Sequence, residues 1–321
     1  MKRIAVMTSG GDAPGMNAAI RAIVRAGLEN DVEVYGIRQA YKGLLAGDMS
    51  LMTSRSVSGI LQRGGTILQT ARNEEFKTAE GQRRVIRRLN ERGIEGVIVI
   101  GGDGSLRGTQ TLHKLGIKAI GIPASIDNDI WGTDMSIGVD TALNTILDAL
   151  DRLRDTASSH NRAFVIEVMG RDAGYLALMG GILGGAEIVI TPEQDTTLET
   201  IAEEIKAAYI NGKSHAITII AEGAPIKATQ IVDFLNESNI GFEVRLTILG
   251  HIQRGGSPSA FDRLLATRMG VFAMEQLLAG ESGVMVGLDG RQMVTHPLET
   301  VTSQTRDISD YYYDMARILS R

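Results

Sequence analysis

Short apolar runs that end in glycine or a polar residue alternate with helical patterns along most of this sequence. The runs are RIAVMTS, VEVYGI, GVIVIGG, KAIGIPAS, AFVIEVMG, EIVITP and AITIIAEG. The helical patterns fall at 14–28, 82–92, 105–115, 140–157, 197–211 and 259–279. This alternation predicts an α/β protein whose mostly parallel sheets are covered by helices on both faces. Ligands of such folds bind beyond the carboxyl ends of the strands, so the polar residues after each run are the candidates for chemistry.

The composition excludes several classes of protein. The 321 residues suffice for two domains or one large α/β unit. A net charge of -5 argues against nucleic acid as the main partner, and the lack of cysteine excludes disulfides and thiolate sites. No apolar run approaches the roughly 18 residues of a membrane span, and the first residues enter a strand with no signal peptide ahead of it. We therefore expect a cytoplasmic protein with no membrane partner.

Residues 10–17, GGDAPGMN, come close to the phosphate-binding loop G-x-x-x-x-G-K-[ST]. Gly10 and Gly15 have its spacing, but Met16 and Asn17 stand where the lysine and the metal-binding hydroxyl belong. The stretch leaves open whether the chain binds a nucleoside triphosphate, and what would replace those two groups.

A second glycine-rich stretch, GGDGSLRG, directly follows the run VIVI. Gly102, Gly104 and Gly108 resemble a loosened dinucleotide fingerprint, and a tight strand-to-helix turn would need glycines too. Asp103 among them would repel a pyrophosphate unless a divalent cation lay between the two. The stretch therefore favours Mg-nucleotide chemistry over hydride transfer.

Asp127 and Asp129 follow the next strand, in PASIDND. Both can face one cleft if the backbone is extended, and such a pair either shares a metal ion or divides the work between metal and general base. The sequence D-N-D is also common in turns. Asp103, expected on the preceding strand of the same sheet, favours the functional interpretation.

Cationic residues gather near the later strand ends: Arg162, Arg171, Arg245, His251 and Arg254. Most isolated arginines are solvated surface, but the glycines beside Arg171 and Arg254 favour bidentate recognition of a second anion. Glu222, also at a strand end, is suited to accept hydrogen bonds from sugar hydroxyls.

Taken together, these motifs resemble the ATP-dependent 6-phosphofructokinase family in its short bacterial form. The resemblance covers essentially the whole chain, through TSGGDAPGMNAAIR, RGGT, GGDGS, IDND, SSHNR, EVMGR, AEG and LGHIQRGG. It implies two Rossmann-like three-layer αβα domains with mostly parallel sheets and the active site in the cleft between them. An ATP-binding domain would comprise 1–138 plus 253–303, and a fructose 6-phosphate-binding domain 139–252 plus 304–321.

The implied reaction transfers the γ-phosphate of MgATP to the 1-hydroxyl of fructose 6-phosphate, giving fructose 1,6-bisphosphate and ADP, the committed step of glycolysis. By resemblance, Gly11 meets the ATP phosphates without a lysine and Arg72 supplies the cation, while Asp103 and Asp129 serve Mg²⁺. The implied ATP-binding residues are Gly11, Arg72, Asn73, Gly102, Asp103, Gly104, Ser105 and Gly108.

Asp127 is implied as the base that takes the proton of the sugar hydroxyl. The implied catalytic set is Asp127, Asp129, Arg171, Arg72, Gly11 and Ser125, the last of which stands where the family usually has threonine. The implied sugar-phosphate set is Ser125, Ile126, Asp127, Arg162, Met169, Gly170, Arg171, Glu222, Arg245, His251, Ile252, Gln253 and Arg254. Arg162 and Arg245 match positions that reach into a neighbouring subunit's site, which implies a homotetramer.

The family also binds an activating nucleoside diphosphate or inhibitory phosphoenolpyruvate between subunits. Matching effector positions are Arg21, Arg25, Arg154, Gly185, Ala186, Glu187, Asn211, Lys213, Ser214 and His215. Ser54, Gly59 and Asn211 stand where relatives often have Arg, Asp and a basic residue, so we expect weakened regulation by ADP and phosphoenolpyruvate.

Three alternatives compete with this interpretation. Pyrophosphate-dependent relatives typically carry Asp at the position of Gly104 and Lys at that of Ala124, and here both are small and uncharged. The NAD and lipid kinases share G-G-D-G, but they would not explain PASIDND or the arginines. A non-catalytic sugar-phosphate or nucleotide sensor would be marked by loss of Asp127 or Asp103, and both are present.

Overall fold

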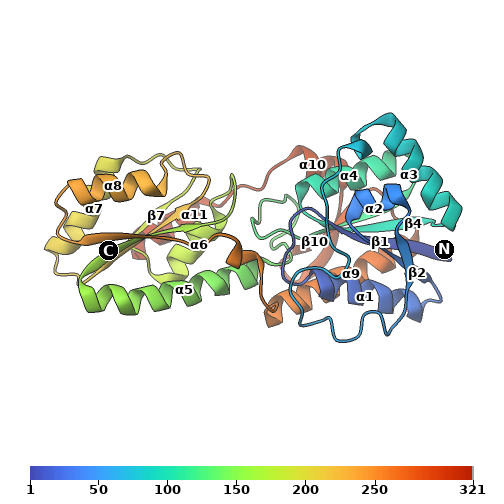
Figure 1. Ribbon diagram of the computed structural model, residues 1–321, viewed down its shortest axis with the longest axis horizontal. Helices are drawn as coiled ribbons and strands as arrows, with labels where there is room; N and C mark the ends of the chain where they lie inside the picture. Colours follow the sequence, from blue (N-terminus) through green and yellow to red (C-terminus); the bar gives the residue numbers. More distant parts are fainter. Residues whose placement is uncertain (320–321) are drawn as a thin grey trace. The chain divides into compact units, whose positions relative to one another are not determined.

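The computed structural model describes residues 1–319, which divide into two compact α/β units (Figure 1). Unit 1 comprises residues 1–126, 130–141 and 254–306, and unit 2 comprises 127–129, 142–253 and the chain from 307. The assignment of ATP to the first unit and of the sugar phosphate to the second stays a prediction.

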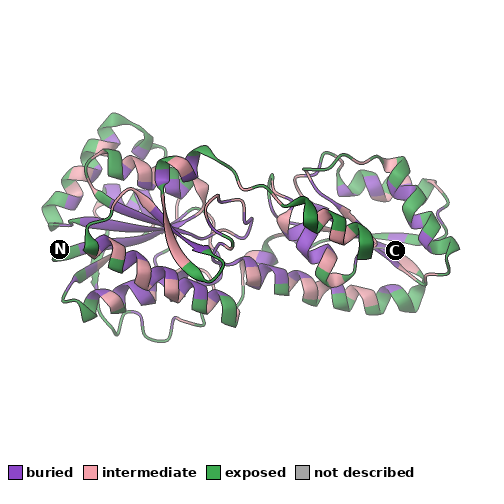
Figure 2. Ribbon diagram, turned by 180° about the vertical axis from the view of Figure 1, so that it is seen from behind, coloured by how far each residue is buried: buried purple, intermediate pink, exposed green. Residues whose placement is uncertain are grey.

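A seven-stranded sheet forms the centre of unit 1, in the order β11-β10-β5-β4-β1-β2-β3. Its strands are β1 (Arg3–Ser9), β2 (Glu33–Ile37), β3 (Met49–Met52), β4 (Gly96–Gly101), β5 (Lys118–Pro123), β10 (Val284–Asp289) and β11 (Gln292–Pro297). Only the edge strands β3 and β11 pair antiparallel with their neighbours. All six residues of β4 are buried, as expected of a parallel strand covered on both faces (Figure 2).

Helices cover both faces of this sheet. On one face lie α1 (Met16–Glu29) and α9 (Ala260–Ala279), and on the other α2 (Ala40–Ala46), α3 (Ala79–Arg92) and α4 (Asp103–Lys114) (Figure 1). The shorter elements are η1 (Glu75–Lys77) and α10 (Leu298–Ser303). The core between the sheet and α2 and α3 is apolar, with Met7, Leu44, Val85 and Leu89 among its buried side chains.

Unit 2 has a four-stranded, fully parallel sheet in the order β7-β8-β6-β9. Its strands are β6 (Arg162–Val168), β7 (Ile188–Ile190), β8 (Ala216–Ala221) and β9 (Glu243–Ile248). Its helices are α5 (Val139–His160), whose first turn belongs to unit 1, α6 (Tyr175–Gly184), α7 (Leu198–Ile210), α8 (Ala228–Glu237) and α11 (Asp310–Leu319). Figure 1 shows α7 and α8 on one face and α5 on the other, so this unit too has three layers.

The predicted α/β class with mostly parallel sheets is confirmed, and every predicted strand run and helix is present. The predicted helices begin and end within three residues of the observed ones. Sequence patterns missed the edge strands β3, β9 and β11, the strand β10 next to β11, and the short or glycine-rich helices. Helix α6, for instance, contains three glycines in ten residues, which hides its helical character.

Candidate active site

Three loops of unit 1 lie side by side at the carboxyl edge of its sheet. Ser9 of β1 pairs with Gly101 of β4, and Gly101 pairs with Pro123 of β5. The strand order reverses between β1 and β4, because β2 lies on the other side of β1. Such a reversal opens a crevice in which α/β proteins bind ligands. The loops that start at residues 10, 102 and 124 all begin at this edge.

The loop of residues 10–17 is built differently from a phosphate-binding loop that contains lysine. Asn17 is 1% exposed, and its amide donates to the carbonyls of Arg63 and Gly64 at 3.0 and 3.2 Å. Its side-chain oxygen accepts the Ile67 N–H at 2.8 Å. Met16 is also 1% exposed and packs in the core. Neither residue is placed to contact a phosphate, and Asn17 instead anchors the RGGT loop beside residues 10–15.

Asp103 begins α4, so its carboxylate stands at the helix N-terminus. The side chain is 45% exposed and forms an ion pair with Arg107, with 2.9 Å between Oδ2 and Nε. Ser105, the third residue of α4, is buried. Its carbonyl accepts hydrogen bonds from the hydroxyl groups of Tyr41 and Thr109 at 3.1 and 2.8 Å. At Gly104 an added methyl group would meet nothing within 4 Å. The first turn of α4 therefore offers open space beside a carboxylate.

Tyr41 is a residue of this region that sequence reasoning missed. A methyl group on Gly108 would come 2.2 Å from the Tyr41 hydroxyl oxygen, so only glycine fits there. The Tyr41 ring stacks on Phe76, with centroids 4.4 Å apart, and burial raises the pKa of Tyr41 far above its ordinary value. No local pattern reveals this contact, because Tyr41 and Gly108 come from separate helices.

Arg72 and Asn73 follow the loop that Asn17 anchors. The Thr70 hydroxyl donates to the Gly10 carbonyl at 2.8 Å, which ties this segment to the glycine-rich loop. Arg72 is exposed, and the Asn73 side chain accepts the Phe76 N–H at 2.9 Å. Arg254 Nη1 donates to the Asp12 carbonyl at 3.4 Å and lies beside Gly11. The structure thus places Arg254 next to the glycine-rich loop of unit 1.

The IDND segment does not have the extended backbone on which its interpretation was conditional. Asn128 has φ +52°, in the left-handed region, which asparagine tolerates better than most residues. The expectation that Asp127 and Asp129 face the same side, as alternate residues of an extended chain do, therefore does not apply. Asp127 is 1% exposed and pairs with Arg171, with 3.4 Å between its Oδ2 and Arg171 Nε. A buried carboxylate beside a guanidinium is the central feature of this segment.

The MGR turn after β6 is held by two side chains. Glu222 accepts the N–H groups of Gly170 and Arg171 at 3.3 and 2.9 Å. Gln253 is fully buried and accepts the Met169 N–H at 3.2 Å. Arg171 has φ +51°, a strained conformation that these contacts maintain. Burial first, and then Glu222, raises the pKa of the neighbouring Glu167 carboxyl.

Arg162 and Arg245 lie toward the amino edge of the unit 2 sheet, opposite the edge at which the MGR turn lies. Arg162 is the first residue of β6 and pairs in register with Glu243 of β9. Glu243 binds both arginines, with 2.7 Å to Arg162 Nε. The hydrogen bond from Arg162 lowers the pKa of the Glu243 carboxyl. His251 and Ile252 follow β9 at the carboxyl edge and are exposed.

Most of the predicted effector positions of unit 2 form one cluster at the start of β7 and β8. Arg154 bonds to the carbonyls of Gly184 and Gly185 and lies 3.2 Å from the His215 ring nitrogen Nε2. Lys213 pairs with Glu187 at 3.2 Å, and Glu187 also accepts the Ile217 N–H at 2.7 Å. Ala186 and Ser214 lie within the same segments, whereas Asn211 ends α7.

Arg21 and Arg25 line one pocket of about 360 Å³ between α1 and α9 of unit 1. Glu29 and Glu275 line it too. The two arginines therefore lie on the same pocket within this unit, and their role at an effector site stays a prediction.

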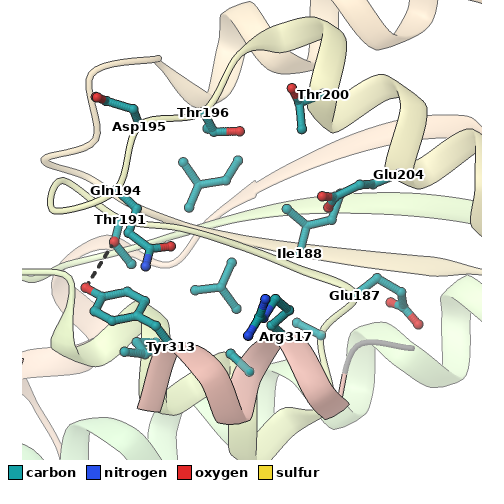
Figure 3. A pocket seen from close by; sticks show the side chains of 15 residues that line it. Glu187, Ile188, Thr191, Gln194, Asp195, Thr196, Thr200, Glu204, Tyr313 and Arg317 are labelled. Atoms are coloured by element: carbon teal, nitrogen blue, oxygen red, sulfur yellow. Dashed lines mark hydrogen bonds between the residues drawn. The ribbon is translucent and has the colours of Figure 1, made fainter. Parts of the chain in front are cut away.

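A further pocket of about 280 Å³ lies in unit 2 between β7, α7 and α11 (Figure 3). Tyr313 and Thr191 meet across one wall, with 3.3 Å between their hydroxyl oxygens, and Arg317 projects into the pocket from α11. Of the predicted site residues, only Ala186 and Glu187 line it.

Within residues 1–319, no group of three or more His, Cys, Asp or Glu side chains is arranged to hold a metal ion. The helices of that range also include none that is both long and apolar enough to cross a membrane.

Comparison with known proteins identifies the class. The family model described as "Phosphofructokinase" matches residues 3–277. The chain therefore belongs to the phosphofructokinase family.

Particular relatives are similar over their full length. An "ATP-dependent 6-phosphofructokinase" of Thermotoga neapolitana is 52% identical, and one of Halalkalibacterium halodurans is 51% identical, each over 100% of both chains. The solved phosphofructokinase of Saccharomyces cerevisiae superposes with a TM-score of 0.90 at 36% identity, and covers 100% of this chain and 48% of that longer one. A pyrophosphate-dependent phosphofructokinase from Marinobacter aquaeolei has a TM-score of 0.86 at 21% identity, which shows a shared fold alone.

Proposed function

We propose that this protein is an ATP-dependent 6-phosphofructokinase, which transfers the γ-phosphate of ATP to the 1-hydroxyl of fructose 6-phosphate. The observation that carries the proposal is the buried carboxylate of Asp127 paired with Arg171 at 3.4 Å. A carboxylate can accept the hydroxyl proton, while the guanidinium stabilises charge on the phosphoryl group that moves. Relatives about half identical over their full length carry this activity in their names.

On the nucleotide side, the proposed phosphate contacts are Gly11 and the exposed Arg72, with Gly102 and Ser105 at the α4 end. The N–H groups at the start of α4 have no partner within the helix, and the helix dipole there favours an anion. Gly108 and the Tyr41–Phe76 pair lie farther along, where an adenine would extend. No lysine is needed, because arginine and backbone N–H groups supply the positive potential.

Asp103 fits a magnesium ligand. Mg²⁺ prefers oxygen ligands and is held by one or two carboxylates together with substrate phosphates, so no cluster of three acids is needed. When bound, the ion would neutralise charge that develops on the phosphates. We assign Asp103 as its main ligand and Asp129 as a helper.

On the sugar side, we propose that Ser125, Ile126, Asp127 and the MGR turn bind the reacting end of fructose 6-phosphate. Glu222 uses one oxygen to hold Gly170 and Arg171 in place, so part of its role is to shape the turn. His251, Ile252, Gln253 and Arg254 would serve the 6-phosphate. Positioning and charge stabilisation then supply most of the rate enhancement, as in other phosphoryl transfers.

The direct test compares phosphoryl donors with the purified protein. With fructose 6-phosphate as acceptor, we expect turnover with MgATP to exceed turnover with pyrophosphate by far, because Gly104 leaves open space for the rest of ATP and neither Gly104 nor Ala124 carries a charge. Fructose 1,6-bisphosphate is measured through a coupled assay, with NAD as an alternative acceptor in parallel. Faster turnover with pyrophosphate would refute the donor assignment, and no transfer to the sugar phosphate would refute the activity.

We also propose that Arg162 and Arg245 serve the site of a neighbouring subunit in a homotetramer. Arg162 is the first residue of β6, which is about 20 Å long at about 3.3 Å per residue, and Arg171 follows the other end of that strand. This placement at opposite ends of one strand favours separate roles for the two arginines.

Arg162→Ala and Arg245→Ala are each expected to weaken fructose 6-phosphate binding far more than ATP binding. Mixing an inactive Asp127→Asn subunit with an inactive Arg162→Ala subunit should restore part of the activity, because some sites then receive both intact residues. Native mass spectrometry would verify mixed tetramers. If verified mixtures gain no activity, these arginines act within their own chain.

Regulation by ADP and phosphoenolpyruvate is proposed at the Arg154–Glu187–Lys213 cluster together with Arg21 and Arg25. Ser54, Gly59 and Asn211 remove charges that relatives often have there. Where Ser54 and Asn211 replace cationic residues, each lost charge-assisted hydrogen bond weakens an anionic ligand by up to about 1–3 kcal/mol, if Arg55 does not substitute. An effector shifts the equilibrium between two quaternary states only as far as its affinity differs between them. Weaker contacts reduce that difference, and so they reduce the shift.

We therefore expect activation by ADP and inhibition by phosphoenolpyruvate only at raised concentrations or with small amplitude. Fructose 6-phosphate saturation curves with and without each effector measure this directly. A large shift at micromolar effector would contradict the expected weakening. As an enzyme of glycolysis, the protein is proposed to work in the cytoplasm.

A further inference from the structure

Asp262 is a fully buried carboxylate that the proposed reaction does not use. It is the third residue of α9. One carboxylate oxygen accepts the Gly138 N–H at 2.8 Å, and the other accepts both the N–H and the hydroxyl of Thr141 at 2.8 and 2.6 Å. Two of the donors belong to Thr141 in the first turn of α5 and the third to Gly138, the residue before it, so the carboxylate binds the start of another helix.

This arrangement replaces a missing helix cap. The first N–H groups of a helix lack partners within it, and an oxygen-bearing side chain just before the helix usually accepts from them. Gly138, which precedes α5, has no side chain, and its φ of +106° favours glycine. Asp140 of α5 reciprocates by accepting the Ser259 hydroxyl at 2.5 Å, and Ser259 caps α9 by accepting the Asp262 N–H at 3.1 Å. Each helix start is thus tied to the other.

The segment that Asp262 holds lies directly against the end of β5. Ile137 N–H donates to the Pro123 carbonyl at 3.1 Å, and Ile137 forms a parallel bridge with Ala124. A methyl group on Gly138 would lie 2.7 Å from Ala13 Cβ and 3.2 Å from Pro14 Cδ of the glycine-rich loop, and 3.4 Å from Ile126 Cγ2. Residues 137 and 138 therefore support 123–126 from one side.

We infer that Asp262 is a positioning residue for the catalytic base, because it holds residues 137–141 against the segment whose next residue is Asp127. The inference rests on the proposed function, which gives Asp127 its role. Asp262 also lies near Gly15 of the glycine-rich loop, where a methyl group added to Gly15 would come 3.4 Å from its main-chain oxygen and 3.6 Å from its Cβ. The substitution Asp262→Asn changes only the carboxyl group and leaves those atoms in place. A fall in turnover caused by Asp262→Asn therefore reports on the hydrogen bonds that hold residues 137–141.

The test begins with Asp262→Asn and Asp262→Ala in the full-length enzyme. Asparagine keeps the shape but offers one acceptor atom where the carboxylate offers two, and alanine removes both. We expect kcat to fall about 10- to 100-fold, with KM for both substrates within about threefold, because a small misplacement of a reacting group costs rate more than binding. Thr197→Ala removes the side-chain cap of α7, which accepts the Thr200 N–H at 3.2 Å, and is the matched control with unchanged kcat.

The second arm repeats Asp262→Asn in an Asp127→Asn background. If Asp262 acts through Asp127, the residual turnover should fall by less than about twofold further, since residues that act in series are not additive. A general loss of folded protein would lower turnover by the same factor in both backgrounds. Hydrogen exchange of the peptide 136–145, followed by mass spectrometry, should rise in Asp262→Asn and not in Thr197→Ala.

The outcomes separate this inference from the proposed function. A wild-type enzyme without ATP-dependent transfer to fructose 6-phosphate would overturn both. Two outcomes with an active wild-type enzyme would overturn only the positioning role. In the first, Asp262→Asn keeps kcat within about twofold of the wild type. In the second, Asp262→Asn lowers turnover by the same factor in the wild-type and Asp127→Asn enzymes.

Discussion

Asp127→Asn is expected to fold normally and to lose most of its turnover. Asparagine has nearly the shape of aspartate, but it cannot accept the proton of the sugar hydroxyl. Removal of a general base costs about 10²–10⁴-fold in rate, and we expect a loss in or above this range. Substrate binding should change much less, so kcat should fall with KM values near those of the wild type.

Steady-state kinetics and thermal unfolding of the same preparation provide the measurement. Asp172→Asn is a matched control, since it removes an exposed carboxylate of the same unit. More than a tenth of wild-type turnover in Asp127→Asn would remove Asp127 from the role of base.

Gly104→Asp should destroy the use of ATP without disturbing the fold. An added Cβ at this position meets nothing within 4 Å, so the new side chain has room. Its charge would stand beside Asp103, where the phosphates are proposed to bind. Like charges brought together in a binding site cost several kcal/mol, so kcat/KM for ATP should fall at least about 100-fold.

Gly104→Asn separates charge from bulk, because asparagine has the size of aspartate and no charge. We expect it to keep much more activity with ATP than Gly104→Asp does. Equal losses in the two variants would mean that space rather than charge matters there. Near-normal ATP kinetics in Gly104→Asp would place the phosphates elsewhere.

Sequence patterns predicted the parts of this fold whose signal is local. Buried parallel strands such as β4 are continuous apolar runs, and a glycine or aspartate directly after such a run must lie at the sheet edge. For this reason the sequence alone singles out Asp103 and Asp127.

Other features depend on contacts between distant segments or on single backbone angles. Tyr41 meets Gly108, and Asp262 meets Gly138, across separations that no periodicity encodes. The left-handed conformation of Asn128 turned a chain segment that alternation alone would have extended. Strands at a sheet edge, such as β11, are only partly buried and so lack a clear apolar pattern.

The contacts of Asn17 determine how easily this loop could be converted into the common phosphate-binding loop. To acquire the lysine and hydroxyl of the common loop, this chain would have to change Met16 and Asn17 together. A lysine at position 16 would place an ammonium group where the side chain is 1% exposed, and loss of Asn17 would strip partners from Arg63, Gly64 and Ile67. Each buried group left without a partner costs about 1–3 kcal/mol, and domain stabilities are only about 5–15 kcal/mol. Each single substitution toward the common loop is therefore expected to destabilise the fold before it could provide a new phosphate contact.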